Sequence, residues 1–117
     1  MQMHASKGIV IMVDSLYHNN IYINGYKFVL TCFACPEQYD VYDPEGVQVA
    51  YLRVRHGTFK VSCPDCGGDV VYIDYPKGDG IFYDSERLAY LKTSVDKIIE
   101  WVLKRKFADV YNSDEYN

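Results

Sequence analysis

Apolar and polar residues alternate most regularly in the middle of the chain. Val47–Arg55 and Thr58–Cys63 are rich in β-branched and aromatic residues, as strands are, and only His56–Gly57 separates them. Gly57 supplies one of the positive-φ positions that a two-residue turn requires. The pattern therefore predicts a β-hairpin that turns at His56–Gly57.

The predicted turn also fixes the register of the hairpin, because side chains alternate between the two faces of a sheet. We expect one face to be apolar and to form the core, and the other to carry three cations. A slip of one residue would bury those cations, so the register should be well specified. The core pairs are Leu52–Val61 and Val54–Phe59, and the outer pairs are Tyr51–Ser62, Arg53–Lys60 and Arg55–Thr58.

Shorter patterns predict further strands on both sides of this hairpin. Asn24–Gly25 suits a type I′ turn, and Asp43–Gly46 has the composition of a type I turn. A four-residue connection at the second turn is preferred, because it places Tyr39 and Val41 in the core and Asp40 near Arg53. The additional strands predicted are Gly8–Val13, Ile21–Ile23, Tyr26–Thr31, Gln38–Tyr42 and Asp69–Tyr75.

The pattern changes to helical spacing after the last strand. Apolar residues recur every three or four positions from Leu88 to Leu103, which predicts a C-terminal amphipathic helix. Asp84 or Ser85 can cap its start, and a second capping signal at Thr93 would allow a break there. Tyr90 and Trp101 lie beside the apolar stripe, where they either cover the sheet edge or form a partner surface.

These elements predict an α+β fold in one domain, residues 1–117, with flexible ends at 1–7 and 112–117. An antiparallel sheet, a meander of hairpins, packs on the C-terminal helix and carries zinc-ribbon-like CxxC knuckles. The net charge of -4 makes a general nucleic-acid binder unfavourable. With no signal-peptide pattern and no apolar stretch that could span a membrane, we expect a cytoplasmic protein without membrane contact.

Four cysteines form two CxxC pairs, Cys32 with Cys35 and Cys63 with Cys66. In a cytoplasmic protein such pairs are thiols or metal ligands rather than disulfides. Two pairs with Pro and Gly at the knuckles have the spacing of a structural zinc site with four thiolate ligands. A redox role is weaker, because redox-active CxxC pairs open a helix and these pairs open onto strands.

The number of strands between the two pairs opposes a shared zinc ion. Three predicted strands separate the pairs, and an odd number places the pairs at opposite ends of a simple meander. One strand would have to bend back, or two chains would share the metal in a homodimer, or the thiols would bind no metal. The sequence leaves these alternatives open.

The outer face of the central hairpin is the best candidate binding surface. Guanidinium groups suit phosphate and carboxylate recognition, and a tyrosine adds a stacking surface. The function predicted is a small non-enzymatic module that binds a protein partner or a small anionic ligand. The simpler alternative is that Asp40, Asp43 or Glu45 neutralise the cations as surface ion pairs. The candidate residues are Tyr51, Arg53, Arg55 and Lys60.

The segment Arg55–His56–Gly57 resembles the RHG motif of histidine phosphatases, but the chain lacks the later second histidine of that family, so His56 is interpreted as a turn residue. A small hydrolase or nucleotide-handling enzyme that uses His56 with Arg53, Arg55 and an acid, Asp79 or Glu86, is the second hypothesis. A nucleic-acid-binding zinc ribbon is the third.

Three segments, CPEQYDVYD, YLRVRHGTF and GDGIFYDSERLAYL, resemble a small prokaryotic or phage protein family of unknown function. The resemblance implies an accessory protein of a phage or bacterium and implies no activity.

Overall fold

The structure is a computed structural model of the chain and describes residues 2–6, 9–14, 20–33 and 36–115. Within these ranges, eight strands form one antiparallel sheet in which each strand pairs with the next along the chain. A single helix follows the last strand. The elements are β1 (Gln2–Ser6), β2 (Ile9–Asp14), β3 (Asn20–Ile23), β4 (Tyr26–Phe33), β5 (Glu37–Tyr42), β6 (Gln48–Arg55), β7 (Thr58–Cys63), β8 (Asp69–Asp74) and α1 (Asp84–Glu115).

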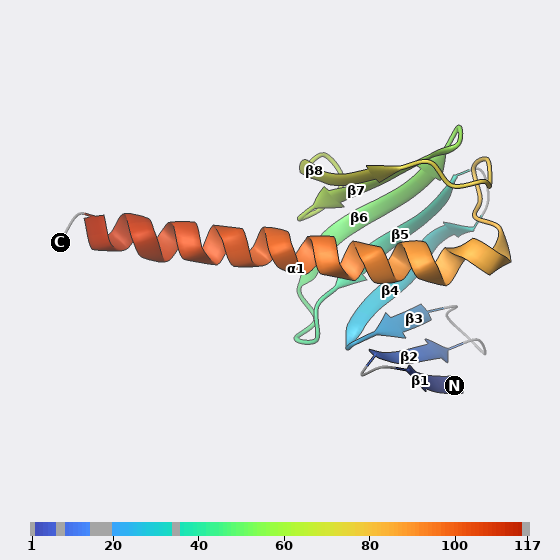
Figure 1. The fold of residues 1–117 in the computed structure, drawn as a ribbon, viewed down its shortest axis with the longest axis horizontal. Coiled ribbons are helices and arrows are strands. Elements are labelled where there is room, and N and C mark those ends of the chain that lie inside the picture. The colour runs from blue at the N-terminus through green and yellow to red at the C-terminus, as the bar shows by residue number, and fades with distance from the viewer. Residues whose placement is uncertain (1, 7–8, 15–19, 34–35, 116–117) are drawn as a thin grey trace.

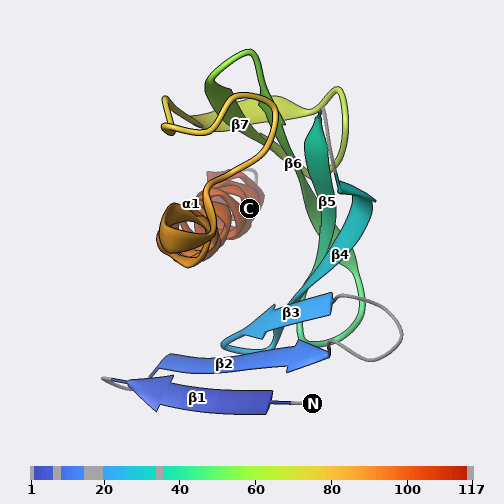
Figure 2. The ribbon, with the colours of Figure 1, turned by 90° about the vertical axis from the view of Figure 1, so that its right-hand side faces the viewer.

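The sheet is strongly curved and wraps partly around the helix. Seen along the helix, β7 lies above α1, β4 to β6 lie beside it and β1 to β3 pass below it (Figure 2). The helix has 32 residues, which corresponds to about 48 Å, and it runs past the sheet toward the C-terminus (Figure 1). This is the predicted α+β meander on a C-terminal helix.

The central hairpin has the predicted register. β6 and β7 pair from Arg55–Thr58 to Tyr51–Ser62, and all five predicted pairs are present. His56 and Gly57 form the turn with positive φ angles of 52° and 71°. Both residues of a type I′ turn need such angles, which explains why the two-residue loop determines the register.

The core lies between this hairpin and the first half of α1. The four predicted core residues of the hairpin are fully buried, and the helix contributes Leu91, Val95 and Ile98. Phe82, from the loop before the helix, packs between Phe59 and Tyr90. Burial of each large side chain stabilises the fold by about 1.5–3 kcal/mol. Since α1 covers the apolar face of the hairpin, the opposite face has no helix over it.

The ends of the elements differ from the expectation at three places. Residues Gln2–Ser6, expected to be loose, form β1, which pairs with β2 from Gln2–Val13 to Ser6–Ile9. The helix has no break at Thr93, because the hydroxyl of Thr93 donates to the Ala89 carbonyl inside the helix rather than capping a new one. The helix also continues through the expected tail as far as Glu115.

The connection between β5 and β6 is one residue longer than predicted. Residues 43–47 form it, with the type I turn closed by a 2.9 Å hydrogen bond from the Gly46 N–H to the Asp43 carbonyl. Tyr39 and Val41 lie in the core, as predicted. A register shift beside Val41 changes the outer face, however. Asp40 lies opposite Tyr51, which makes it a diagonal neighbour of Arg53, as predicted, and Gln38 lies directly opposite Arg53.

Candidate functional site

Three cations lie close together on the face of the sheet that α1 leaves uncovered. Arg53 of β6 is directly opposite Lys60 of β7, and Arg55 is two residues along β6 on the same face. Directly opposed side chains have Cβ atoms about 4.5–5.5 Å apart. The predicted grouping of Arg53, Arg55 and Lys60 on one face is therefore confirmed.

No carboxylate neutralises this cluster among the residues that the structure describes. The ion pairs found there are Arg87–Glu37, Arg87–Asp84 and Lys104–Glu100. The Asp43 carboxylate instead accepts hydrogen bonds from the backbone N–H groups of Glu45 and Val47. Like charges directly opposite each other destabilise a sheet. The cluster is thus a place where a bound anion would relieve repulsion.

The cations line two open hollows in the surface. The larger, of about 540 Å³, is lined by all three cations and extends to β8. The other, of about 470 Å³, extends toward the loop before the helix. Arg53, Arg55 and His56 belong to both. Lys60, Thr58, Ile73 and Tyr75 complete the larger hollow, and Pro36, Gln38, Asp79 and Gly80 complete the smaller.

Tyr51 is the predicted site residue that lies apart from the hollows. It shares the outer face with Arg53, as the register requires, but lines neither hollow. Its hydroxyl donates a 2.7 Å hydrogen bond to Oε1 of Gln38. Burial raises the pKa of Tyr51, although Arg53 acts to lower it. Tyr51 therefore orients Gln38 at the edge of the smaller hollow.

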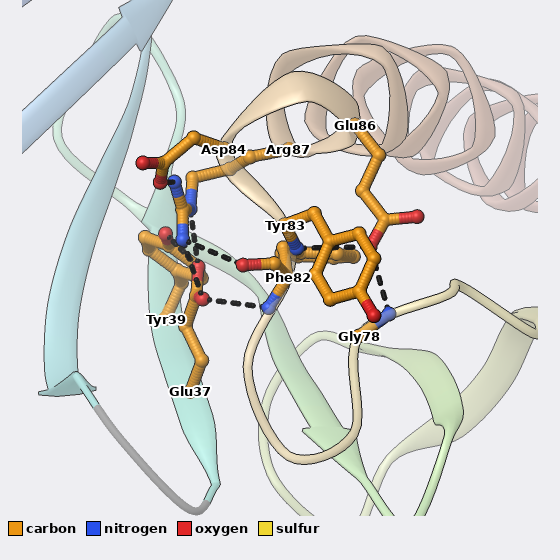
Figure 3. A network of polar contacts seen from close by, with 8 residues as sticks. All are labelled: Glu37, Tyr39, Gly78, Phe82, Tyr83, Asp84, Glu86 and Arg87. Atoms are coloured by element: carbon orange, nitrogen blue, oxygen red, sulfur yellow. Dashed lines mark hydrogen bonds and ion pairs between the residues drawn. The ribbon is translucent and has the colours of Figure 1, made fainter.

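A buried ion pair fixes the loop that carries Asp79. Glu37, 2% exposed, accepts hydrogen bonds from Arg87 at 2.8 Å and 3.0 Å and from the Phe82 N–H at 3.0 Å. Its other partner is the hydroxyl of Tyr39 (Figure 3). The Glu37 backbone N–H also donates to the Gly80 carbonyl at 2.7 Å. One residue at the start of β5 thus holds both the loop and the helix start.

The Glu37 network has the chemistry of a structural clamp. The carboxylate already accepts four hydrogen bonds, about as many as its oxygens can accept, so none is open to a substrate. The hydrogen bonds to Glu37 raise the pKa of Arg87 above its ordinary value. Burial, followed by the hydrogen bond to Glu37, raises the pKa of Tyr39. These shifts keep Arg87 charged and Tyr39 neutral.

The sequence contained one unused signal for this clamp. Glu37 is two residues before Tyr39 and four before Val41, both of which were assigned to the core, so alternation places Glu37 on the same face. A carboxylate in the core requires a cationic partner. Arg87 is fifty residues away in the sequence, and no spacing rule identifies it.

The helix begins differently from the prediction. The carbonyl of Tyr83 accepts the first helical hydrogen bond, from the Arg87 N–H, so Tyr83 is the N-cap rather than Asp84 or Ser85. Glu86 accepts hydrogen bonds from the N–H groups of Tyr83, Lys77 and Gly78, each at 2.9 Å. Burial acts to raise the pKa of Glu86, but these three donors outweigh it and lower the pKa.

The proposed catalytic set is therefore only partly brought together. His56 and Asp79 line the same hollow with Arg53 and Arg55. Glu86 binds three backbone N–H groups in the loop instead, and it lines neither hollow.

The register separates the two CxxC pairs. Cys32, Gln38, Arg53 and Lys60 lie in one row across the strands, and Cys63 is three residues farther along β7. This places Cys32 and Cys63 about 14 Å apart across the sheet and about 10 Å apart along it. Two thiolates on one zinc ion each lie about 2.3 Å from the metal. Cys35 lies outside the described residues.

The described cysteines give no further support for the zinc knuckles. No group of three or more potential ligands is found in the described part of the chain. Burial, and then the Asp69 carboxylate, raise the pKa of Cys63 to about 12. Cys66 is exposed. Zinc binding stays a prediction, and in this fold it would require separate sites or two chains.

Tyr90 and Trp101 pack against the sheet. Tyr90 stacks on Phe82, with ring centroids 5.3 Å apart, and Trp101 donates a 3.2 Å hydrogen bond from Nε1 to Asp69 at the start of β8. Both are partly buried against the core. Both side chains thus cover the helix-facing side of the last two strands, which corresponds to the simpler of the two interpretations.

Comparisons with protein-family models, curated proteins and solved structures found no match to this chain. The resemblance to a prokaryotic or phage family stays a prediction. In the described ranges, no helix is long and apolar enough to cross a membrane.

Proposed function

We propose that this protein is a small binding module that recognises an anionic group through Arg53, Arg55 and Lys60. The observation that carries the proposal is the direct opposition of Arg53 and Lys60 on an uncovered face, with no carboxylate paired to either in the described residues. Evolution toward stability alone would place opposite charges, not like charges, in such a pair. A bound anion supplies the missing countercharge.

The surroundings of the cations support this proposal. A hollow of about 540 Å³ is within the size range of ligand sites, although it is open on one side. Arginine presents a planar fork that fits carboxylate and phosphate groups, and lysine adds a mobile positive charge. Since the whole chain has a net charge of -4, the cluster is a local positive region on an acidic protein. Such a region steers an acidic partner to one face.

Charge reversal at the cluster tests the proposal. We expect Arg53→Glu with Arg55→Glu to weaken binding of poly-glutamate and of tripolyphosphate, measured by isothermal titration calorimetry, by at least tenfold. The matched control is Lys104→Glu with Lys106→Glu, which makes the same change of charge on exposed helix positions. Binding equal to wild type in the first variant, or an equal loss in both, would refute recognition by this face.

A second candidate function is hydrolysis of a phosphate ester. The observation that favours it is that His56 and Asp79 line one hollow with Arg53 and Arg55, so an acid, a base and phosphate-binding groups are in one place. A screen of phosphate esters tests it. Activity that persists unchanged in His56→Ala would exclude this mechanism.

A further inference from the structure

The last strand of the sheet has an open edge. β8 is hydrogen-bonded to β7 alone, and no loop of the described residues makes a backbone hydrogen bond to its other side. The outer edge therefore presents a row of unpaired N–H and C=O groups. Such an edge is a template for a further strand from another protein.

A β-bulge lines this edge with apolar side chains. Val70 pairs with Ser62 and Tyr72 with Val61, so Val71 is an extra residue in β8. Without the bulge, Val70 and Ile73 would face opposite sides; with it, both lie on the uncovered face. Their side chains are 52% and 47% exposed, and that of Tyr75, just after the strand, is 72% exposed. Unpartnered apolar side chains in a row indicate a contact surface.

This apolar row continues into the cationic hollow. Ile73 is directly opposite Lys60, and both Ile73 and Tyr75 line the larger hollow together with Arg53 and Arg55. The hollow therefore extends from the cations on β6 and β7 to the open edge at β8. A side chain that enters from the edge would therefore meet Ile73 and Tyr75 as well as the cations in one hollow.

We propose that β8 is the docking edge for an extended segment of a partner protein, which adds a ninth strand and places a carboxylate side chain in the hollow. The proposal rests on the proposed function, because it names the partner class for the same cations. A ninth strand would lie about 10 Å from β7. Lys60 and a glutamate of the new strand can meet across that distance, with Ile73 between their backbones.

A second copy of this chain fits the edge less well. Asp69 and Asp74 stand at the two ends of β8, opposite the buried residues Cys63 and Phe59 and hence on the helix side. Two antiparallel copies aligned end to end would place Asp69 of one strand against Asp74 of the other, and like charges repel. The same two carboxylates require that the acidic residues of a partner strand point only toward the uncovered face.

A peptide titration tests strand addition. The probe is a fluorescein-labelled ten-residue peptide in which glutamate alternates with valine, and its binding is followed by fluorescence anisotropy. Successive N–H groups of a strand point to opposite edges. Two modified peptides are compared, one N-methylated at every valine and the other at every glutamate. We expect one of them, whose modified N–H groups would face β8, to bind at least tenfold more weakly, and the other to change in affinity by less than threefold. Loss with both modifications, or with neither, would overturn strand addition.

Protein variants separate this inference from the proposed function. Ile73→Glu should weaken peptide binding at least tenfold, whereas Val47→Glu, at a similarly exposed position on the β5–β6 connection, should not. If Arg53→Glu with Arg55→Glu weakens binding while Ile73→Glu and N-methylation do not, the cation site stands and strand addition fails. If Ile73→Glu and N-methylation weaken binding while Arg53→Glu with Arg55→Glu does not, the edge binds peptides but the cation site fails. A dimer that Ile73→Glu dissociates would assign the edge to a second copy and overturn the inference.

Discussion

Removal of the Arg87 side chain should destabilise the fold strongly, and the contacts of Arg87 allow the size of the effect to be worked out. Arg87 donates to Glu37 from Nε at 2.8 Å and from Nη2 at 3.0 Å, and Nη2 also donates to the Phe82 carbonyl at 3.1 Å. Arg87→Met would leave a carboxylate that is 2% exposed without its cation.

Removal of one partner of a buried ion pair costs about 3–5 kcal/mol. Arg87 is 20% exposed, and the Tyr39 hydroxyl and the Phe82 N–H still bind Glu37 in the variant, so the lower end, about 3 kcal/mol, is expected. Domains of this kind have a free energy of unfolding of about 5–15 kcal/mol. With a urea slope of about 1.5 kcal/mol per molar, the midpoint should fall by about 2 M.

Equilibrium urea unfolding, followed by far-UV circular dichroism, measures this shift. The matched control is Asp84→Asn, which removes the other carboxylate partner of Arg87; Asp84 is 98% exposed, so little change is expected. Glu37→Met combined with Arg87→Met should recover part of the loss, because an apolar pair removes both buried charges. A midpoint shift below about 0.5 M in Arg87→Met, or strict additivity in the double variant, would contradict the clamp.

Three further predictions follow from the loops and the cysteines. Gly78→Ala should lower the unfolding free energy by more than about 2 kcal/mol, because the new Cβ would lie 1.8 Å from the Ile81 carbonyl oxygen. Gly46→Ala, with open space around the new Cβ, should lower it by about 1 kcal/mol. Urea midpoints of the two variants measure the difference. The pKa of Glu86 is lowered in the fold, so ionised Glu86 stabilises the fold at pH values above its ordinary pKa of 4.5, and this contribution is lost as the pH falls through the folded-state pKa. The difference in unfolding free energy between wild type and Glu86→Gln should therefore shrink between pH 7 and pH 3. Because the register separates Cys32 from the second CxxC pair, Cys32→Ser should not change the rate at which the Cys66 thiol reacts with a thiol reagent. One zinc ion per monomeric chain with all four thiols protected would contradict the register.

The sequence predicted the part of the fold that depends on local rules. The His56–Gly57 step permits one tight turn, and that turn determines five cross-strand pairs and the identity of the core face. The strand-count objection to a shared zinc site came from the same rule, since three consecutive strands carry Cys63 away from Cys32. In both cases a local rule, the tight turn between consecutive strands, determines where residues lie several strands away.

The features that the sequence did not predict depend on contacts between distant residues or on irregular strands. Nothing near Arg87 indicates its pairing with Glu37, and a tyrosine N-cap at Tyr83 is outside the usual capping residues. The register shift beside Val41, where Val49 is an extra residue of β6, brings Tyr39 opposite Leu52 and Gln38 opposite Arg53. Asp40 lies near Arg53, but no ion pair joins it to the cations among the described residues.

The position of Gln38 links the fold to the proposed function. A carboxylate directly opposite Arg53 would supply a countercharge within the sheet, and the outer face would then be an ordinary salt-bridged surface. With Gln38 there, Arg53 faces an uncharged amide on one side and Lys60 on the other, and no ion pair neutralises Arg53 among the described residues. The second irregularity, the extra Val71 in β8, brings Val70 and Ile73 to the same face and places an apolar wall beside that charge. The extra Val71 thus places exposed apolar side chains beside the three cations, at the edge of the sheet where we propose that a partner strand docks.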